Sequence, residues 1–306
     1  MTKDYWDLTD KLQTKIKLNI LKGYLGAWAK IFANRNWCKG MYFVDCFAGR
    51  GKYHNQGAKN VIDGSPLIAL NIAKIIKEKY GGRITCFFIE EDPAVFKDLQ
   101  IFTEPFKTKI DFQSIKGDTN KEIYKVLDQI PDKWSMPIFF FVDPSGIDIK
   151  SDSIKAMLKK PNIKEFLITY IQKGVERSLG FGKKVLLDLP IQIRQKAMSN
   201  LKRVEDFFGV EWQELSGNQK ENLKKYLNVF VDYNKTVPLK DQLKHKAIEI
   251  LYNQGRNKYH LIFLSRNEVA LKIIEDIFTN TTLKNTLFSG LSSLEKRKIL
   301  RGKFDL

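Results

Sequence analysis

The stretch from Met41 to Gly51, MYFVDCFAGRG, constrains the fold more than any other part of this 306-residue chain. An apolar run ends in an acid, Asp45, and a small turn that contains Gly49 follows. A short apolar run without alternation is typical of a strand buried on both faces of a sheet. Because ligands of such sheets bind outside the carboxyl ends of the strands, the sequence predicts a ligand at this loop. Its glycines would let the backbone approach that ligand closely.

Segments of the same kind recur along the chain and alternate with segments of helical character. The predicted strands are 41–46, 84–90, 110–116, 138–142, 166–171 and 259–265. The predicted helices are 9–33, 65–80, 93–99, 122–130, 151–158 and 269–278, the second with Ser65 as its cap and Pro66 in its first turn. This alternation predicts an α/β fold, a Rossmann-like, doubly wound parallel sheet with helices on both faces.

The alternation stops near residue 174. From there to residue 255 the chain is charged and shows only helix-like patches, such as 204–208 and 223–229. We therefore expect a Rossmann-like core with an N-terminal helix over 1–173 and a helical insertion over 174–255. A return strand and helix over 256–306 would complete the core and end in a basic tail.

The composition of the chain indicates which binding partners and which cellular compartment to expect. The chain has 52 Lys and Arg residues against 35 Asp and Glu residues, a formal net charge of +17. This excess favours a polyanion such as nucleic acid, although a protein from a lysine-rich proteome would show the same balance. Cys38, Cys46 and Cys86 form no C-x-x-C pair, so we expect neither a metal site nor disulfides. No apolar run has the length of a membrane span and no signal core is visible, so we expect a soluble, cytoplasmic protein without membrane contact.

Acidic residues end four of the predicted strands. They are Asp45, Glu90 with Glu91 beside it, Asp118 and Asp143. Since the carboxyl ends of parallel strands meet at one edge of a sheet, we expect these acids to converge. An ordered set of acids around a glycine-rich loop is the pattern of methyltransferases that use S-adenosylmethionine (SAM), so SAM is the expected cofactor.

Carboxylates suit SAM because they accept hydrogen bonds and SAM offers donors. In this interpretation Asp45 and the loop of Phe47, Ala48, Gly49 and Gly51 hold the methionine end, and the sulfonium charge favours the acidic pocket. The acid that ends strand 84–90 takes the ribose hydroxyls. The acid before helix 122–130 accepts from the adenine amino group.

Each of these residues has a structural alternative when taken alone. Asp45 could cap the end of its strand, Glu90 could be the solvated end of a buried strand, and Asp118 could cap the helix that follows. Two other nucleotide sites fit less well. The dinucleotide fingerprint G-x-G-x-x-G lacks its third glycine after Gly49 and Gly51, and no GxxxxGK[ST] phosphate loop occurs.

The segment 143–146, DPSG, is the candidate chemical centre, and its expected catalytic residues are Asp143, Pro144 and Ser145. Methyltransferases that act on amino groups of nucleic acids carry an acid, two prolines and an aromatic residue here. The acid and a backbone carbonyl accept hydrogen bonds from the target amine, and the ring stacks on the flipped base. This chain keeps the acid and one proline, and Tyr170 or Tyr53 could supply a ring; a structural role is the alternative for both. Methylation of nitrogen is the expected chemistry, and a tight turn after a buried strand is the structural alternative.

The strings FVDCFAGRGKY, DGSPLIAL, FFFVDPSG and YHLIFLSRN occur in this order and resemble the three-Cys-motif partner (TcmP) proteins. The resemblance covers residues 12–278 apart from the insertion. It implies a SAM-methyltransferase-like protein with a partner that bears a three-cysteine motif; the three cysteines of this chain are unrelated to that name. The TcmP family is similar in turn to ribosomal RNA adenine-N6 methyltransferases of the RlmJ type, which share the G-S-P segment.

The RlmJ-type enzymes carry a Lys-His pair in the first helix that contacts SAM. Lys17 is the matching lysine here, and Leu18 replaces the histidine. The chain departs from those enzymes at this histidine and at the missing Pro-aromatic pair, whereas the acids of the SAM site are intact. The full set of expected cofactor-binding residues is Lys17, Asp45, Phe47, Ala48, Gly49, Gly51, Ser65, Glu90, Glu91, Asp118 and Asp143.

Two functions remain open. The first is SAM-dependent methyl transfer to a nitrogen of RNA or DNA, in which the insertion grips the substrate through the pairs at 202–203 and 224–225; a solvated helix face is the alternative for both pairs. The second is a methyltransferase-fold binding module that serves a three-Cys-motif partner, with weak or no catalysis. A protein substrate is a further alternative that these residues do not exclude.

Overall fold

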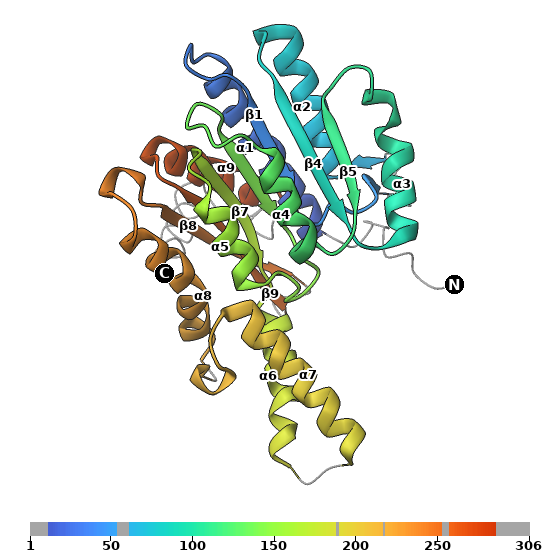
Figure 1. Ribbon diagram of the computed structural model, residues 1–306, viewed down its shortest axis with the longest axis vertical. Coiled ribbons are helices and arrows are strands. Elements are labelled where there is room, and N and C mark those ends of the chain that lie inside the picture. Colours follow the sequence, from blue (N-terminus) through green and yellow to red (C-terminus); the bar gives the residue numbers. More distant parts are fainter. Residues whose placement is uncertain (1–11, 54–60, 188–189, 217, 253–256, 286–306) are drawn as a thin grey trace.

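The computed structural model describes residues 12–53, 61–187, 190–216, 218–252 and 257–285, and a seven-stranded sheet lies at its centre (Figure 1). Its strands are β1 (Met41–Asp45), β4 (Ile84–Glu90), β5 (Phe112–Lys116), β6 (Ile138–Val142), β7 (Lys164–Tyr170), β8 (Lys244–Tyr252) and β9 (Asn257–Ser265). They lie in the order β5-β4-β1-β6-β7-β9-β8. The first five are parallel to one another, and β9 is antiparallel to both of its neighbours.

The strand order changes direction at β1. The chain runs outward from β1 to β4 and β5 and then returns to β6 on the other side of β1. At such a switch point the connections leave the two central strands in opposite directions, which opens a crevice above their carboxyl ends. Asp45 ends β1 and Asp143 follows β6 directly. The topology therefore brings these two acids to adjacent strand ends.

Nine α-helices are described around the sheet. They are α1 (Leu12–Ala33), α2 (Ser65–Tyr80), α3 (Pro93–Thr103), α4 (Thr119–Gln129), α5 (Ser151–Lys159), α6 (Gln172–Gly182), α7 (Ile191–Phe208), α8 (Gln219–Lys235) and α9 (Glu268–Asn285). Two hydrophobic cores separate them: α1, α2, α3 and α9 share one core, and α4, α5, α6, α7 and α8 share the other. None of the described helices is long and apolar enough to cross a membrane.

The sheet is covered on both faces, which confirms the predicted doubly wound α/β class, but it is mostly and not wholly parallel, because β9 runs antiparallel to β7 and β8. Successive residues of β6 show why its sequence is uniformly apolar. Phe139 and Phe141 enter the core beside α1 and α2, whereas Phe140 and Val142 enter the core beside α4 and α5. A strand with a helix layer on each side has no polar face, so no alternation is visible in its sequence.

Two local predictions need correction, and one pair of short strands was not predicted. The chain from 244 to 252, which lay in the range predicted as helical insertion, is the edge strand β8. Two short strands, β2 (Lys52–Tyr53) and β3 (Ile62–Asp63), pair beside the glycine loop. The cap of α2 is Gly64; Ser65 is the first helical residue, with its side chain buried.

The predicted insertion divides into two parts of different character. Helices α6 and α7 lie side by side as an arm that projects from the sheet (Figure 1). Helix α8 packs on the sheet instead, where Tyr226 contacts Tyr170 and Phe230 contacts Phe166. Tyr170 is buried in this aromatic cluster, so it is not placed to stack on a base. The predicted boundaries of the three parts stay a prediction.

Candidate active site at the switch point

Asp45 is fully buried at the carboxyl end of β1. Its Oδ1 accepts a hydrogen bond from the Phe47 N–H at 3.2 Å, whereas Oδ2 is buried without a hydrogen-bond partner among the described residues. Burial raises the pKa of Asp45 to about 7; the Ser65 hydroxyl and the Phe47 N–H lower it, and the charges of Asp143 and Glu90 raise it. An unpaired buried oxygen costs about 1–3 kcal/mol. A donor or a cation beside Oδ2 would therefore be stabilising.

Glu90 holds the loop that follows β1. Its Oε2 accepts from the Gly49 N–H at 2.8 Å, and its Oε1 accepts from the Asp92 N–H at 2.9 Å. Burial raises the pKa of Glu90, and these N–H groups counteract the rise. Each carboxylate oxygen has two lone pairs, so both can accept a second donor. Glu90 thus shapes the loop and still offers acceptors to a ligand.

Glycine is required at three places in and behind this loop. Gly49 and Gly51 have φ values of 63° and 89°, in the left-handed region where a side chain is strained. The Gly64 N–H donates to the Gly51 carbonyl at 2.7 Å, and a Cβ on Gly64 would lie 2.9 Å from that oxygen. Ala48 is buried and its N–H donates to the Ile89 carbonyl at 2.9 Å. The loop is therefore fixed from two sides.

Lys17 reaches the site from α1 and meets Asp143. Its Nζ lies 2.6 Å from Oδ1 and 2.7 Å from Oδ2, and the two side chains are only 14% and 19% exposed. The same Nζ lies 5.5 Å from the centre of the Tyr259 ring. Charge-assisted hydrogen bonds in a partly desolvated site are stronger than an exposed ion pair. Lys17 therefore fixes the orientation of the Asp143 carboxylate, and each oxygen keeps a lone pair for a further donor.

The loop after Asp143 is held by a second acid, Asp148. Pro144 is buried, and Ser145 is exposed with its Oγ donating to Asp148 Oδ2 at 3.3 Å. Arg203 of α7 donates to the other oxygen, Oδ1, at 2.8 Å. The Ser145 hydroxyl thus shapes the loop, and its catalytic role stays a prediction.

Asp118 caps α4, which is the structural role expected from the sequence as the alternative to adenine binding. Its Oδ1 accepts from the Asn120 N–H at 2.9 Å and from Asn120 Nδ2 at 3.1 Å. The next residue, Thr119, donates from its hydroxyl to the Cys46 carbonyl and so ties α4 to the end of β1. Asp118 is half-buried, which leaves its predicted contact with adenine open. Glu91 is exposed at the end of β4.

Asn120 and Asp148 hold the loop that follows β6, and the sequence did not single out either residue. Asn120 Nδ2 donates to the Asp148 carbonyl at 2.8 Å, and its Oδ1 accepts from the Lys150 N–H at 2.8 Å and the Ser153 hydroxyl at 2.9 Å. One amide thereby clamps the loop after β6 to the start of α4. Asn120 stands in the first turn of α4 and Asp148 in the loop after β6, and no local signal in the sequence separates them from other polar residues at such positions.

The residues at the switch point fit SAM by the chemistry of their donors and acceptors. Asp45 and Glu90 offer carboxylate oxygens to an ammonium group and to ribose hydroxyls, and the buried unpaired Oδ2 favours positive charge beside it. Gly49 and Gly51 have no side chains, so the backbone of this loop can approach the cofactor closely. Asp143 lies close enough to Asp45 for their charges to interact, so the predicted chemical centre adjoins the predicted cofactor site.

Comparisons with known proteins give short or distant likenesses. No protein-family model matches the chain. A segment of 70 residues, 23% of this chain, is 34% identical to a protein of Methanocaldococcus jannaschii named as an endonuclease subunit of a type I restriction enzyme, and it spans 6% of that protein. Among solved structures, an O-methyltransferase from Bacillus cereus in complex with SAH has a TM-score of 0.39 and 9% identity, over 85% of this chain and 98% of that one. An SAH-bound methyltransferase from Podospora anserina has a TM-score of 0.31 and 10% identity, over 78% and 76%.

Proposed function

We propose that this protein is a SAM-dependent methyltransferase that transfers a methyl group to a nitrogen of nucleic acid. One observation carries the proposal: Asp45 and Asp143 adjoin at the switch point, one with a buried unpaired oxygen and the other oriented by Lys17. The first suits a cationic cofactor, and the second suits an amine that must be positioned. The resemblance to the TcmP proteins agrees with a SAM site but does not name the substrate.

SAM would supply the electrophilic methyl group, and the chain's own residues would hold and orient the reactants. Asp45, Glu90 and the glycine loop are the residues that would hold the cofactor. Asp143 would accept a hydrogen bond from the target N–H and so direct the nitrogen lone pair; such positioning converts a bimolecular step into an effectively intramolecular one. Lys17 keeps the Asp143 carboxylate in place through two hydrogen bonds.

The charge of the chain supports nucleic acid as the methyl acceptor. The formal net charge is +17, and the α6–α7 arm adjoins the loop that carries Asp143. The pairs predicted as phosphate contacts are less free than expected, because Lys202 lies 3.1 Å from Asp206 and Lys225 lies 3.5 Å from Glu214. Partners of this kind agree with the alternative of a solvated helix face. Arg177 and Lys196 of the arm have no such partner among the described residues, and the basic tail lies outside those residues.

The first test is calorimetric titration of SAM and S-adenosylhomocysteine into the protein and into an Asp45→Asn variant. We expect micromolar binding that the variant loses. Radiolabelled SAM is then incubated with RNA and with DNA, and label in the polymer is counted for the protein and for Asp143→Asn. Absence of SAM binding by a folded protein would reject the proposed cofactor, and transfer that survives in Asp143→Asn would reject the role of that acid.

A second candidate is a binding module that serves a three-Cys-motif partner. It is favoured by exposed apolar side chains on the arm: Leu187, Ile191 and Met198 are 57%, 66% and 59% exposed. Exposed apolar residues that gather on one element mark interaction surfaces. A stable complex that forms with the partner, and whose function is intact in Asp143→Ala, would favour this candidate over the enzyme.

A further inference from the structure

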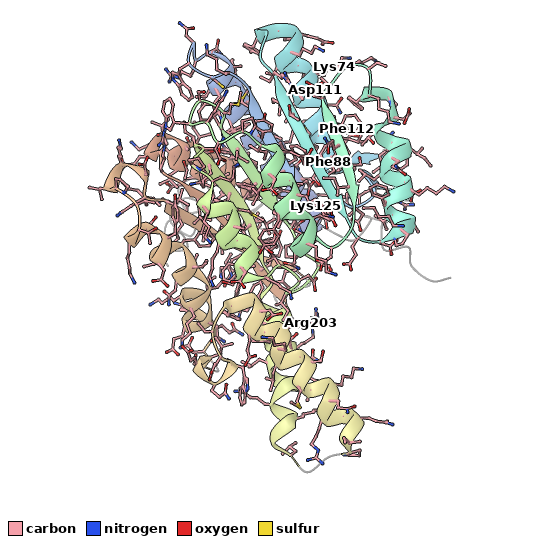
Figure 2. The ribbon with its side chains drawn as sticks, viewed as in Figure 1. Lys74, Phe88, Asp111, Phe112, Lys125 and Arg203 are labelled. Atoms are coloured by element: carbon pink, nitrogen blue, oxygen red, sulfur yellow. The ribbon has the colours of Figure 1, made fainter. Side chains whose placement is uncertain are left out.

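A pocket of about 360 Å³ lies where the α6–α7 arm meets the loop after β6. Three segments line it: the loop contributes Gly146 and Ile147, and the two helices contribute the rest. The helix residues are Gly174, Arg177, Ser178 and Phe181 from α6 and Lys196, Asn200 and Arg203 from α7. Figure 2 shows Arg203 at the junction between the arm and the rest of the molecule.

The lining of this pocket is cationic. It contains three cations, Arg177, Lys196 and Arg203, and no acid. Arg177 and Lys196 are exposed, and neither forms an ion pair within the described part of the chain. The hydroxyl of Ser178 and the amide of Asn200 add hydrogen-bond donors. Two uncompensated cations with neutral donors between them form a lining suited to an anion such as phosphate.

The same excess of positive charge extends along the arm. Residues 172–208, which make up the arm, contain eight Lys or Arg residues against four acids, Glu176, Asp188, Glu205 and Asp206. A nucleic-acid strand is a line of negative charges and gains affinity from each phosphate that a cation meets. A basic arm whose innermost pocket is cationic thus favours a polyanion over a small isolated anion.

Contacts tie the pocket to the predicted chemical centre. Asp148 accepts from Ser145 at 3.3 Å and from Arg203 at 2.8 Å, so one carboxylate joins the loop to α7. A Cβ on Gly174 would lie 3.7 Å from Gly146 Cα, which places the first turn of α6 against the same loop. The pocket therefore has a fixed position relative to Asp143, three residues before its first lining residue.

We propose that this pocket binds a backbone phosphate of the nucleic-acid strand and thereby places a neighbouring nucleotide at Asp143. The inference rests on the proposed function, since it names where that substrate is held. Arg177 and Lys196 contact the phosphate directly. Arg203 sets the distance between pocket and chemical centre through Asp148.

The test compares two double variants with the same change of charge. Arg177→Gln/Lys196→Gln removes the two cations of the pocket that have no ion-pair partner among the described residues. Lys79→Gln/Lys97→Gln is the matched control, because these lysines are also exposed and lie on α2 and α3, on the other core of the sheet. Affinity for a labelled mixed-sequence single-stranded RNA and for its DNA counterpart is measured over a range of salt concentrations, and SAM affinity is measured by calorimetry.

We expect the pocket variant to bind the oligonucleotide about tenfold more weakly, with the slope of log affinity against log salt reduced by about 0.7 for each phosphate that the variant no longer neutralises. The control should stay within about twofold of the unmodified protein, and SAM affinity should be equal in all three. Equal weakening in both variants would overturn the pocket and leave a nucleic-acid substrate standing. If the unmodified protein binds SAM but neither oligonucleotide, the proposed substrate fails and the pocket with it.

Discussion

Two carboxylates are buried at opposite ends of the central sheet and differ in how they are paired. Asp45 lies at the carboxyl end of β1, and Glu165 lies near the amino end of β7. Burial raises the pKa of each to about 7. Glu165 has a donor on each oxygen, the Tyr24 hydroxyl at 2.6 Å and the Ser265 hydroxyl at 2.8 Å. One oxygen of Asp45 accepts from the Phe47 N–H at 3.2 Å, and the Ser65 hydroxyl is close enough to lower the pKa of the carboxyl, but the second oxygen has no hydrogen-bond partner among the described residues.

This difference in hydrogen bonding suggests a structural role for Glu165 and a ligand-binding role for Asp45. A buried acid whose hydrogen bonds are complete holds elements together, and Glu165 joins α1, β7 and β9 in this way. A buried acid that lacks some of its hydrogen bonds lowers stability, and it is retained where a ligand supplies the missing ones. Helix α1 contacts both ends, through Tyr24 at Glu165 and through Lys17 at Asp143. Changes at the carboxyl end should therefore alter binding or turnover, and changes at the amino end should alter stability.

The largest effect is expected for Asp143→Asn. Asparagine keeps the shape of the side chain but lacks the charge that Lys17 and the target amine require, so methyl transfer should fall about 10²–10³-fold while SAM still binds. Single-turnover transfer of label from SAM measures the step. Glu165→Gln serves as the control for removal of a carboxylate elsewhere, and an equal fall in both variants would remove the contrast between the two ends.

Tyr24→Phe should lower the free energy of unfolding by about 1–3 kcal/mol, because it leaves one Glu165 oxygen buried without its donor. Urea denaturation followed by circular dichroism gives the value. SAM affinity should not change, since Tyr24 lies at the amino end of the sheet. Stability equal to that of the unmodified protein would show that the Glu165 network does not hold the fold.

Asp45→Asn should make the protein more stable at pH 8 and less able to bind SAM. The folded pKa of about 7 lies above the usual value of 3.8, so the folded state holds the proton more tightly than the unfolded state. Stability supplied by that proton is present at low pH and is lost as the pH rises from about 4 to 7. The variant has no such proton, and its gain at pH 8 is on the order of 1–3 kcal/mol.

Thermal unfolding from pH 5 to pH 8 measures this difference. The unmodified protein should lose more stability over that interval than Asp45→Asn does. Glu165→Gln gives the reference, because Glu165 has a similar pKa and complete hydrogen bonds. If the two variants gain equally and both keep SAM binding, the unpaired oxygen of Asp45 has no special role.

The smallest effect is expected for Asp148→Asn. The variant weakens the ion pair with Arg203 and loosens the junction of loop and arm, so transfer should fall about 3–10-fold, with SAM affinity unchanged. Initial rates at several oligonucleotide concentrations separate binding from turnover. A change in SAM affinity alone would place Asp148 in the cofactor site instead.

Much of the fold followed from sequence because the central strands are buried on both faces. Apolar runs such as 84–90 and 138–142 coincide with β4 and β6. Strand β8 was missed because it is an edge strand, in which Lys244, Lys246 and Glu249 interrupt the apolar pattern. Asp45, Glu90 and Asp143 were found for the same reason as the strands, since each marks the point where a buried run stops.

The sequence by itself determined the alternation of strands and helices, the glycine loop and the acids that end the strands, because each depends on neighbours in the chain. Only the tertiary structure decided which of those acids meet and how each is paired. Lys17 and Asp143 are 126 residues apart, and Tyr24 and Glu165 are 141 apart. Whether both oxygens of a buried carboxylate accept hydrogen bonds depends on donors that folding brings from distant segments. No local sequence pattern encodes that difference.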